Sequence, residues 1–149
     1  MAVLHLDADA VNQTPAAVDQ TPAAVDGMHL ERMTLGDRRL EREVLELFLQ
    51  QAAILLERID RAPRELGAAS AHTLKGSARG IGAWRVARAA GVVEVAASGD
   101  AGEAGLAEAV AELRAASLEA SAAIIARLAA LVSPSGRPPQ RWPGDNQMR

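Results

Sequence analysis

The sequence predicts an all-α protein, an antiparallel up-and-down four-helix bundle with a short extra helix at its N-terminal end. Apolar residues recur at steps of three and four through most of residues 28–132, and short segments containing glycine or proline separate these stretches. Strand-like alternation of apolar and polar residues is almost absent. A chain of 149 residues can build one compact core but hardly two, so we expect a single folded domain at residues 28–132.

Both ends of the chain differ in composition from this central part. Residues 1–27 carry aspartates but no lysine or arginine and contain the immediate duplication QTPAAVDQTPAAVD, whose prolines exclude a coiled coil. Residues 133–149 contain four prolines and carry more arginine than aspartate. We therefore expect a disordered acidic leader at residues 1–27 and a disordered, proline-rich basic tail at residues 133–149.

A short helix is expected at residues 28–33, and the first long helix at residues 37–60. Asp37 can cap the long helix, because its carboxylate can accept hydrogen bonds from the free amides of the first turn. The predicted core face of this helix consists of Leu40, Val44, Leu47, Phe48, Leu55 and Ile59.

The second long helix is predicted at residues 63–80. Pro63 fits its first position, where the missing N–H has no cost, and Gly80 and Gly82 supply the flexibility of a C-terminal stop. At 100° per residue, His72 lies roughly opposite the predicted core residues of this helix and is expected to point to solvent. Those core residues are Leu66, Ser70, Leu74 and Ile81.

The last two helices are predicted at residues 84–97 and 106–131. The core face of the earlier helix consists of Val86, Ala90, Val93 and Ala97. That of the later helix consists of Leu106, Val110, Leu113, Ser117, Ala120, Ile124, Leu128 and Leu131. Because only 2% of the residues are aromatic, the core must pack through aliphatic and alanine side chains, which permit close approach of helices.

Composition excludes several classes of function. The chain has no cysteine, so disulfides and thiolate chemistry are not available. No run of apolar residues approaches the roughly 20 that a membrane span needs, and no basic leader is present. We therefore expect a cytoplasmic protein without membrane contact. No basic stripe suits a nucleic acid, and neither His5 nor His29 has a second ligand at metal-binding spacing.

The segment AHTLKGSARGIGA, residues 71–83, contains the candidate reactive group, His72. Its neighbours on the same helix face are Lys75 and Gly76 one turn later and Arg79 two turns later. A glycine inside a helix costs about 1 kcal/mol relative to alanine, so Gly76 needs a compensating reason. Side chains lean toward the N-terminus of a helix, so glycine at this position leaves the imidazole open to another protein.

An exposed imidazole can act as a nucleophile toward phosphorus near neutral pH, since its ordinary pKa is about 6.5. The phosphoramidate so formed carries about two negative charges. Lys75 is the single lysine of the chain, and it could place an ammonium group near the phosphoryl oxygens. Arg79 could contact the same oxygens or meet an acidic rim on a partner.

The same segment resembles the signature of histidine-containing phosphotransfer (HPt) domains. In that signature a histidine is followed by an apolar residue at +2, lysine at +3, glycine at +4, small residues, and a Gly-Ala pair at +10 and +11. The matching residues here are His72, Leu74, Lys75, Gly76, Ser77, Gly82 and Ala83. VLELFLQQAAILLERI resembles the preceding helix of the family and VVEVAASGD the following one, so that the resemblance covers roughly residues 37–132.

The resemblance implies a phosphorelay intermediate of two-component signalling. His72 would accept a phosphoryl group from a receiver-domain aspartate and pass it to another receiver. Lys75 would favour the phosphorylated state, and Gly76 would clear room for the receiver. The implied partners are response-regulator receiver domains and a hybrid histidine kinase. Mg²⁺ would be held by the receiver, so that this chain is a phosphocarrier rather than an enzyme and needs no cofactor, metal or nucleotide of its own.

Three other interpretations are weaker. The dimerisation helix of histidine kinases carries an acidic residue after its histidine and a proline a few positions later, and Thr73 and Ser77 disagree with both. A non-phosphorylated helical-bundle interaction module would still bind its partner after His72→Ala. A hydrolase would need a second acid, base or oxyanion group near the histidine, where the sequence offers only cations. We expect a monomer, because one chain covers all four predicted apolar seams.

Overall fold

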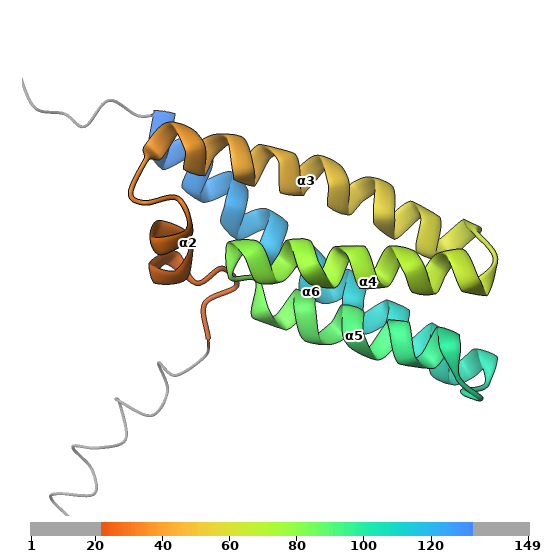
Figure 1. Ribbon diagram of the computed structural model, residues 1–149. Coiled ribbons are helices and arrows are strands. Elements are labelled where there is room, and N and C mark those ends of the chain that lie inside the picture. Colours follow the sequence, from red (N-terminus) through yellow and green to blue (C-terminus); the bar gives the residue numbers. More distant parts are fainter. Residues whose placement is uncertain (1–21, 133–149) are drawn as a thin grey trace, which may run out of the picture.

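The computed structural model describes residues 22–132, which form five helices (Figure 1). These are α2 (Gly27–Met33), α3 (Arg38–Arg61), α4 (Arg64–Ile81), α5 (Trp84–Ser98) and α6 (Glu103–Val132). The described residues are 85% helical and contain no strand, which confirms the predicted all-α class. Most of the predicted leader, residues 1–21, and the whole predicted tail, residues 133–149, lie outside the described part.

The four long helices lie alongside one another and run back and forth along a common direction (Figure 1). Helix α3 packs against α4 and α6, and α5 packs against the same two helices. The short helix α2 lies across one end of this group and contacts α4. The side chains of α4 and α6 that face away from the shared core therefore lie on opposite sides of the molecule.

The ends of α3 and α4 follow from local residue chemistry. The carboxylate of Asp37 accepts hydrogen bonds from the amides of Arg39 and Leu40, so the predicted cap is confirmed. Pro63 is the N-cap residue of α4 rather than its first helical residue. Gly82 alone ends α4, with a left-handed φ of 79°, and Gly80 is still helical.

The core face of α3 differs from the predicted one. Leu40 and Leu47 are exposed, whereas Leu45 and Ala52 are buried together with Phe48 and Leu55. The face that meets α4 and α6 is rotated about the helix axis, and it includes an alanine that the apolar spacing passed over. Leu66, in the first turns of α4, is likewise exposed rather than buried. The predicted core residues of α5 and α6 are buried or half-buried.

Helix α6 departs from the expectation that no stretch resembles a membrane span. Its 30 residues are long and apolar enough to cross a membrane, by length and composition only. It nevertheless packs against α3 and α5. Four ion pairs also join it to these helices: Arg127 with the buried Glu41, Arg114 with Asp60, and Arg85 with both Glu112 and Glu119.

Candidate functional site

His72 lies in the middle of α4 and points to solvent, with 68% of its side chain exposed. The opposite side of the same two turns is fixed in the core by Ala71, Leu74 and Ala78, each fully buried. The imidazole is thus carried on a packed helix rather than on a loop, which limits the movement of its backbone.

A carboxylate from the neighbouring helix α5 holds both His72 and Lys75. Glu94 Oε1 lies 2.8 Å from Nδ1 of His72, and Glu94 Oε2 lies 2.7 Å from Nζ of Lys75. The prediction that only cations lie near the histidine is therefore wrong, because the spacing along α4 does not identify Glu94. Glu94 is the single acidic residue of α5, but only its position beside α4 in the fold shows that it reaches His72.

The charge state of Glu94 determines which ring nitrogen of His72 is free. The hydrogen bond from Lys75, and secondarily the one with His72, lowers the pKa of the Glu94 carboxyl below its usual value, so the group is ionised at neutral pH. An ionised carboxylate only accepts hydrogen bonds. We therefore assign the proton of the neutral ring to Nδ1, which donates to Glu94, and this leaves the lone pair on Nε2.

Lys75 is more enclosed than His72, and its stem lies along α5. The position that a Cβ of Gly91 would occupy is 3.5 Å from Cδ of Lys75, so the glycine in α5 allows the lysine stem to pass close to that helix. One of the three ammonium donors is used by Glu94, which leaves two for another acceptor.

Gly76 and Arg79 lie farther along the same side of α4. A Cβ at Gly76 would meet no atom within 4 Å, so the space above this residue is open. The side chain of Arg79 is exposed and forms no hydrogen bond or ion pair within residues 22–132. Its backbone carbonyl accepts a hydrogen bond of 2.9 Å from Nε2 of His29 in α2.

An open groove between α4 and α5, here called the basic groove, begins at Lys75 and has a volume of about 710 Å³. Its charged lining residues are Lys75, Arg79 and Arg88, all cationic. Its remaining lining residues are Pro22, Trp84, Ala87, Gly91 and Val95. A surface that combines cations with small and apolar side chains suits a protein partner with an acidic rim.

Pro22, from the segment before α2, lines the basic groove, and the start of α2 contacts the α4–α5 turn beside it. The carboxylate of Asp26 accepts hydrogen bonds from the amide of His29 and from Nε1 of Trp84, and these bonds lower the pKa of the Asp26 carboxyl. The rings of His29 and Trp84 meet edge to face at 4.8 Å between centroids. These contacts fix Trp84 at the edge of the groove.

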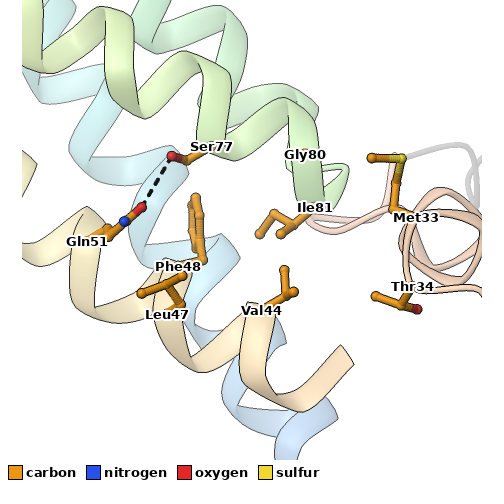
Figure 2. A pocket seen from close by; sticks show the side chains of 9 residues that line it. All are labelled: Met33, Thr34, Val44, Leu47, Phe48, Gln51, Ser77, Gly80 and Ile81. Atoms are coloured by element: carbon orange, nitrogen blue, oxygen red, sulfur yellow. Dashed lines mark hydrogen bonds between the residues drawn. The ribbon is translucent and has the colours of Figure 1, made fainter. Parts of the chain in front are cut away.

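A second cavity, of about 270 Å³, lies on the other side of α4 between α2, α3 and α4 (Figure 2). Apolar side chains dominate its lining, and its polar members include Ser77 and Gln51, joined by a hydrogen bond of 3.4 Å. No titratable side chain lines it. Residues 22–132 also contain no cluster of three or more His, Cys, Asp or Glu residues that could hold a metal ion. The reactive groups therefore gather at His72.

Comparison with known protein families identifies a family to which this chain is similar. The family model described as Hpt domain matches residues 43–133. The matched region includes α4, with His72, Lys75, Gly76 and Arg79, and α5, with Glu94. Searches of curated proteins and of solved structures gave no significant match.

Proposed function

Because the chain belongs to the Hpt domain family, we propose that it is a phosphorelay intermediate whose antiparallel four-helix bundle presents His72 to receiver domains. The family implies histidine phosphotransfer in two-component signalling, and its members are phosphocarrier modules rather than catalytic enzymes. The observation that supports this proposal most directly is the exposed His72 ring, whose Nδ1 is held by Glu94.

In the proposed transfer, the lone pair on Nε2 of His72 attacks the phosphorus of a receiver aspartyl phosphate. The N–P bond forms as the P–O bond breaks, and the receiver aspartate leaves as a carboxylate. Nδ1 keeps its proton, so the ring becomes positively charged, and the carboxylate of Glu94 at 2.8 Å stabilises that charge. Transfer to a second receiver is the reverse reaction with a different aspartate.

The neighbouring residues have separate roles in this proposal. Lys75 directs its two unused N–H donors to the phosphoryl oxygens while it holds Glu94. Gly76 leaves room for the receiver loops. Arg79, together with Arg88, contacts the acidic rim of the receiver site along the basic groove. The chain supplies a positioned nucleophile and positive charge, whereas Mg²⁺ belongs to the receiver.

The partners we propose are response-regulator receiver domains and a hybrid histidine kinase in the cytoplasm. The chain binds no nucleotide and has no autonomous catalytic activity in this proposal. The upstream phosphoryl donor is therefore always another protein.

The direct test mixes the full chain with a receiver domain carrying a radiolabelled aspartyl phosphate. We expect acid-labile, base-stable label on the wild-type chain and none on His72→Gln. The matched control is His29→Gln, which changes the other histidine of the described residues and should still be labelled. Label that survives in His72→Gln would refute His72 as the acceptor.

A second experiment tests the role of Glu94 as a positioning residue. Glu94→Gln keeps the size of the side chain but removes its charge and replaces one of its two acceptor oxygens by an NH₂ donor, so the amide cannot accept from both His72 and Lys75 as the carboxylate does. We expect transfer to slow by about tenfold, by analogy with the loss of activity when a partner that orients a metal-binding histidine is removed. Nitrogen NMR of the ring should show a fall in the Nδ1–H tautomer; an unchanged tautomer ratio would contradict the assigned role.

The basic groove also supports an alternative function, a non-phosphorylated interaction module that binds a signalling partner. In that case the wild-type chain would bind the receiver without accepting label, and His72→Ala would bind equally well. Binding measured by calorimetry beside the labelling assay separates the two functions.

A further inference from the structure

The outward side of α6 carries exposed apolar residues at a regular spacing. Steps of four and three alternate through the exposed residues Ala111, Ala115, Leu118, Ala122 and Ile125, and Val132 follows one heptad later. We call these six residues the outer seam. Its large side chains are far from buried: 74% of Leu118, 59% of Ile125 and 62% of Val132 is exposed.

The interior of the bundle does not account for this side of α6. Helix α6 is the most apolar of the four long helices, yet only 22% of the residues in its most apolar 18-residue stretch are buried. The charged residues of α6 between Ala111 and Val132 all form ion pairs with other helices of the same chain. They are Glu112, Arg114, Glu119 and Arg127. The outer seam is therefore an uncharged strip whose neighbouring charges are already paired.

The spacing of the outer seam is that of a coiled-coil interface. In heptad terms, Ala115 and Ala122 occupy the a positions, whereas the large residues Leu118, Ile125 and Val132 occupy d positions. In an antiparallel pair of such helices each a position faces a d position. With a two-fold axis between Ala122 and Ile125, Ala122 would face Ile125 of the second copy. Ala115 would face Val132, so each of these layers would contain one alanine and one large aliphatic residue and the two helices could approach closely.

We propose that the outer seam pairs antiparallel with the outer seam of a second copy of this chain, related by a two-fold axis. When two copies of the seam run in opposite directions, alanines of one copy lie opposite large residues of the other, as an interface between two identical surfaces requires. Residues 115–132 of the two copies would face each other over about 26 Å, and a third of the circumference of a helix of about 11 Å diameter gives roughly 300 Å² per copy. The total of about 600 Å² is below the usual size of a stable interface, so the dimer is weak and concentration-dependent.

The dimer leaves the phosphotransfer site free. His72 projects from α4, whereas the outer seam faces away from α3 and α5 on α6. The prediction of a monomer rests on apolar seams that are covered within one chain. The outer seam is an additional one, and its pairing does not depend on phosphorylation of His72.

The test measures association of the full chain by sedimentation between about 10 µM and 1 mM, where an interface of this size forms. We expect a reversible dimer that Ile125→Glu weakens about tenfold or more, because two carboxylates would enter the seam. The matched control is Ile54→Glu on α3, where the isoleucine is 53% exposed, and it should dimerise like the wild type. A wild-type chain that is monomeric at 1 mM, or an equal effect of both variants, overturns the proposal.

Cross-linking tests the antiparallel arrangement, since the chain has no cysteine of its own. Ala122→Cys lies near the proposed axis and should form a disulfide dimer. Ala111→Cys should not, because its two copies would be about 38 Å apart along the helix axis. Cross-linking of both variants would show a parallel pair and overturn the arrangement. Binding of a monomeric chain to phosphatidylcholine–phosphatidylglycerol vesicles, abolished by Ile125→Glu, would assign the seam to a membrane surface instead.

Discussion

Substitution of Gly76 by glutamine should increase stability and block phosphotransfer at once. Gly76 lies inside α4, and a Cβ there would meet no atom within 4 Å. A residue with high helix propensity can therefore be added without a clash. Replacement of a helical glycine by such a residue stabilises by about 0.5–1 kcal/mol, so we expect Gly76→Gln to raise the free energy of unfolding by this amount.

The same substitution should harm function because of where the new side chain points. A side chain at position 76 leans toward the N-terminus of α4 and thus over His72, one turn earlier. The receiver must bring its aspartyl phosphate within bonding distance of Nε2, and the glutamine would occupy that path. Urea denaturation measures the gain in stability, and the rate of label transfer from the receiver measures the loss of function.

Gly80→Gln provides the matched control. A Cβ at Gly80 also meets nothing within 4 Å, but this glycine lines the cavity between α2, α3 and α4 rather than the basic groove. We expect a gain in stability with normal transfer. If Gly76→Gln transfers as fast as wild type, the open space above Gly76 has no role in docking. If Gly76→Gln does not gain stability, the inference that a side chain at position 76 fits without a clash is wrong.

Three further predictions concern stability. Gly82→Ala should lower the free energy of unfolding by about 1–2 kcal/mol, because φ is 79° and the new Cβ would lie 2.9 Å from Cβ of Asp26; an unchanged urea midpoint would refute this. The pKa of Asp26 is lowered below 3.8, chiefly by the backbone amide of α2, so its contribution is present above that pH and is lost on acidification through the folded-state value. Asp26→Asn should therefore lose less stability than wild type between about pH 5 and pH 2, and an equal loss would contradict the assignment. Arg127→Met should cost about 3 kcal/mol, since Glu41, with 5% of its surface exposed, would lose its partner; the double variant with Glu41→Gln should recover part of that loss in thermal unfolding.

The features that could be predicted from the sequence are those that depend on local chemistry. Asp37 caps α3 and Gly82 ends α4 because one side chain, or the lack of one, decides the backbone geometry there. The outward direction of His72 follows from helical periodicity alone. The core faces of α5 and α6 were predicted for the same reason.

The features that could not be predicted depend on how the helices meet. Leu40 and Leu47 have apolar spacing but are exposed, because the contacts with α4 and α6 select a face centred on Leu45 and Ala52. Glu94 is separated from His72 by 22 residues in the sequence. Its role becomes visible only when α5 lies beside α4, since no periodic pattern on either helix identifies the pair.

The bond between Glu94 and His72 has a consequence for protein engineering. Residues 71–83 transplanted onto a helix of another protein would carry the histidine, the lysine and the glycine but not the carboxylate that orients the ring. A functional graft would have to include residues 64–98, so that the helical hairpin is the smallest portable unit of this reactive centre.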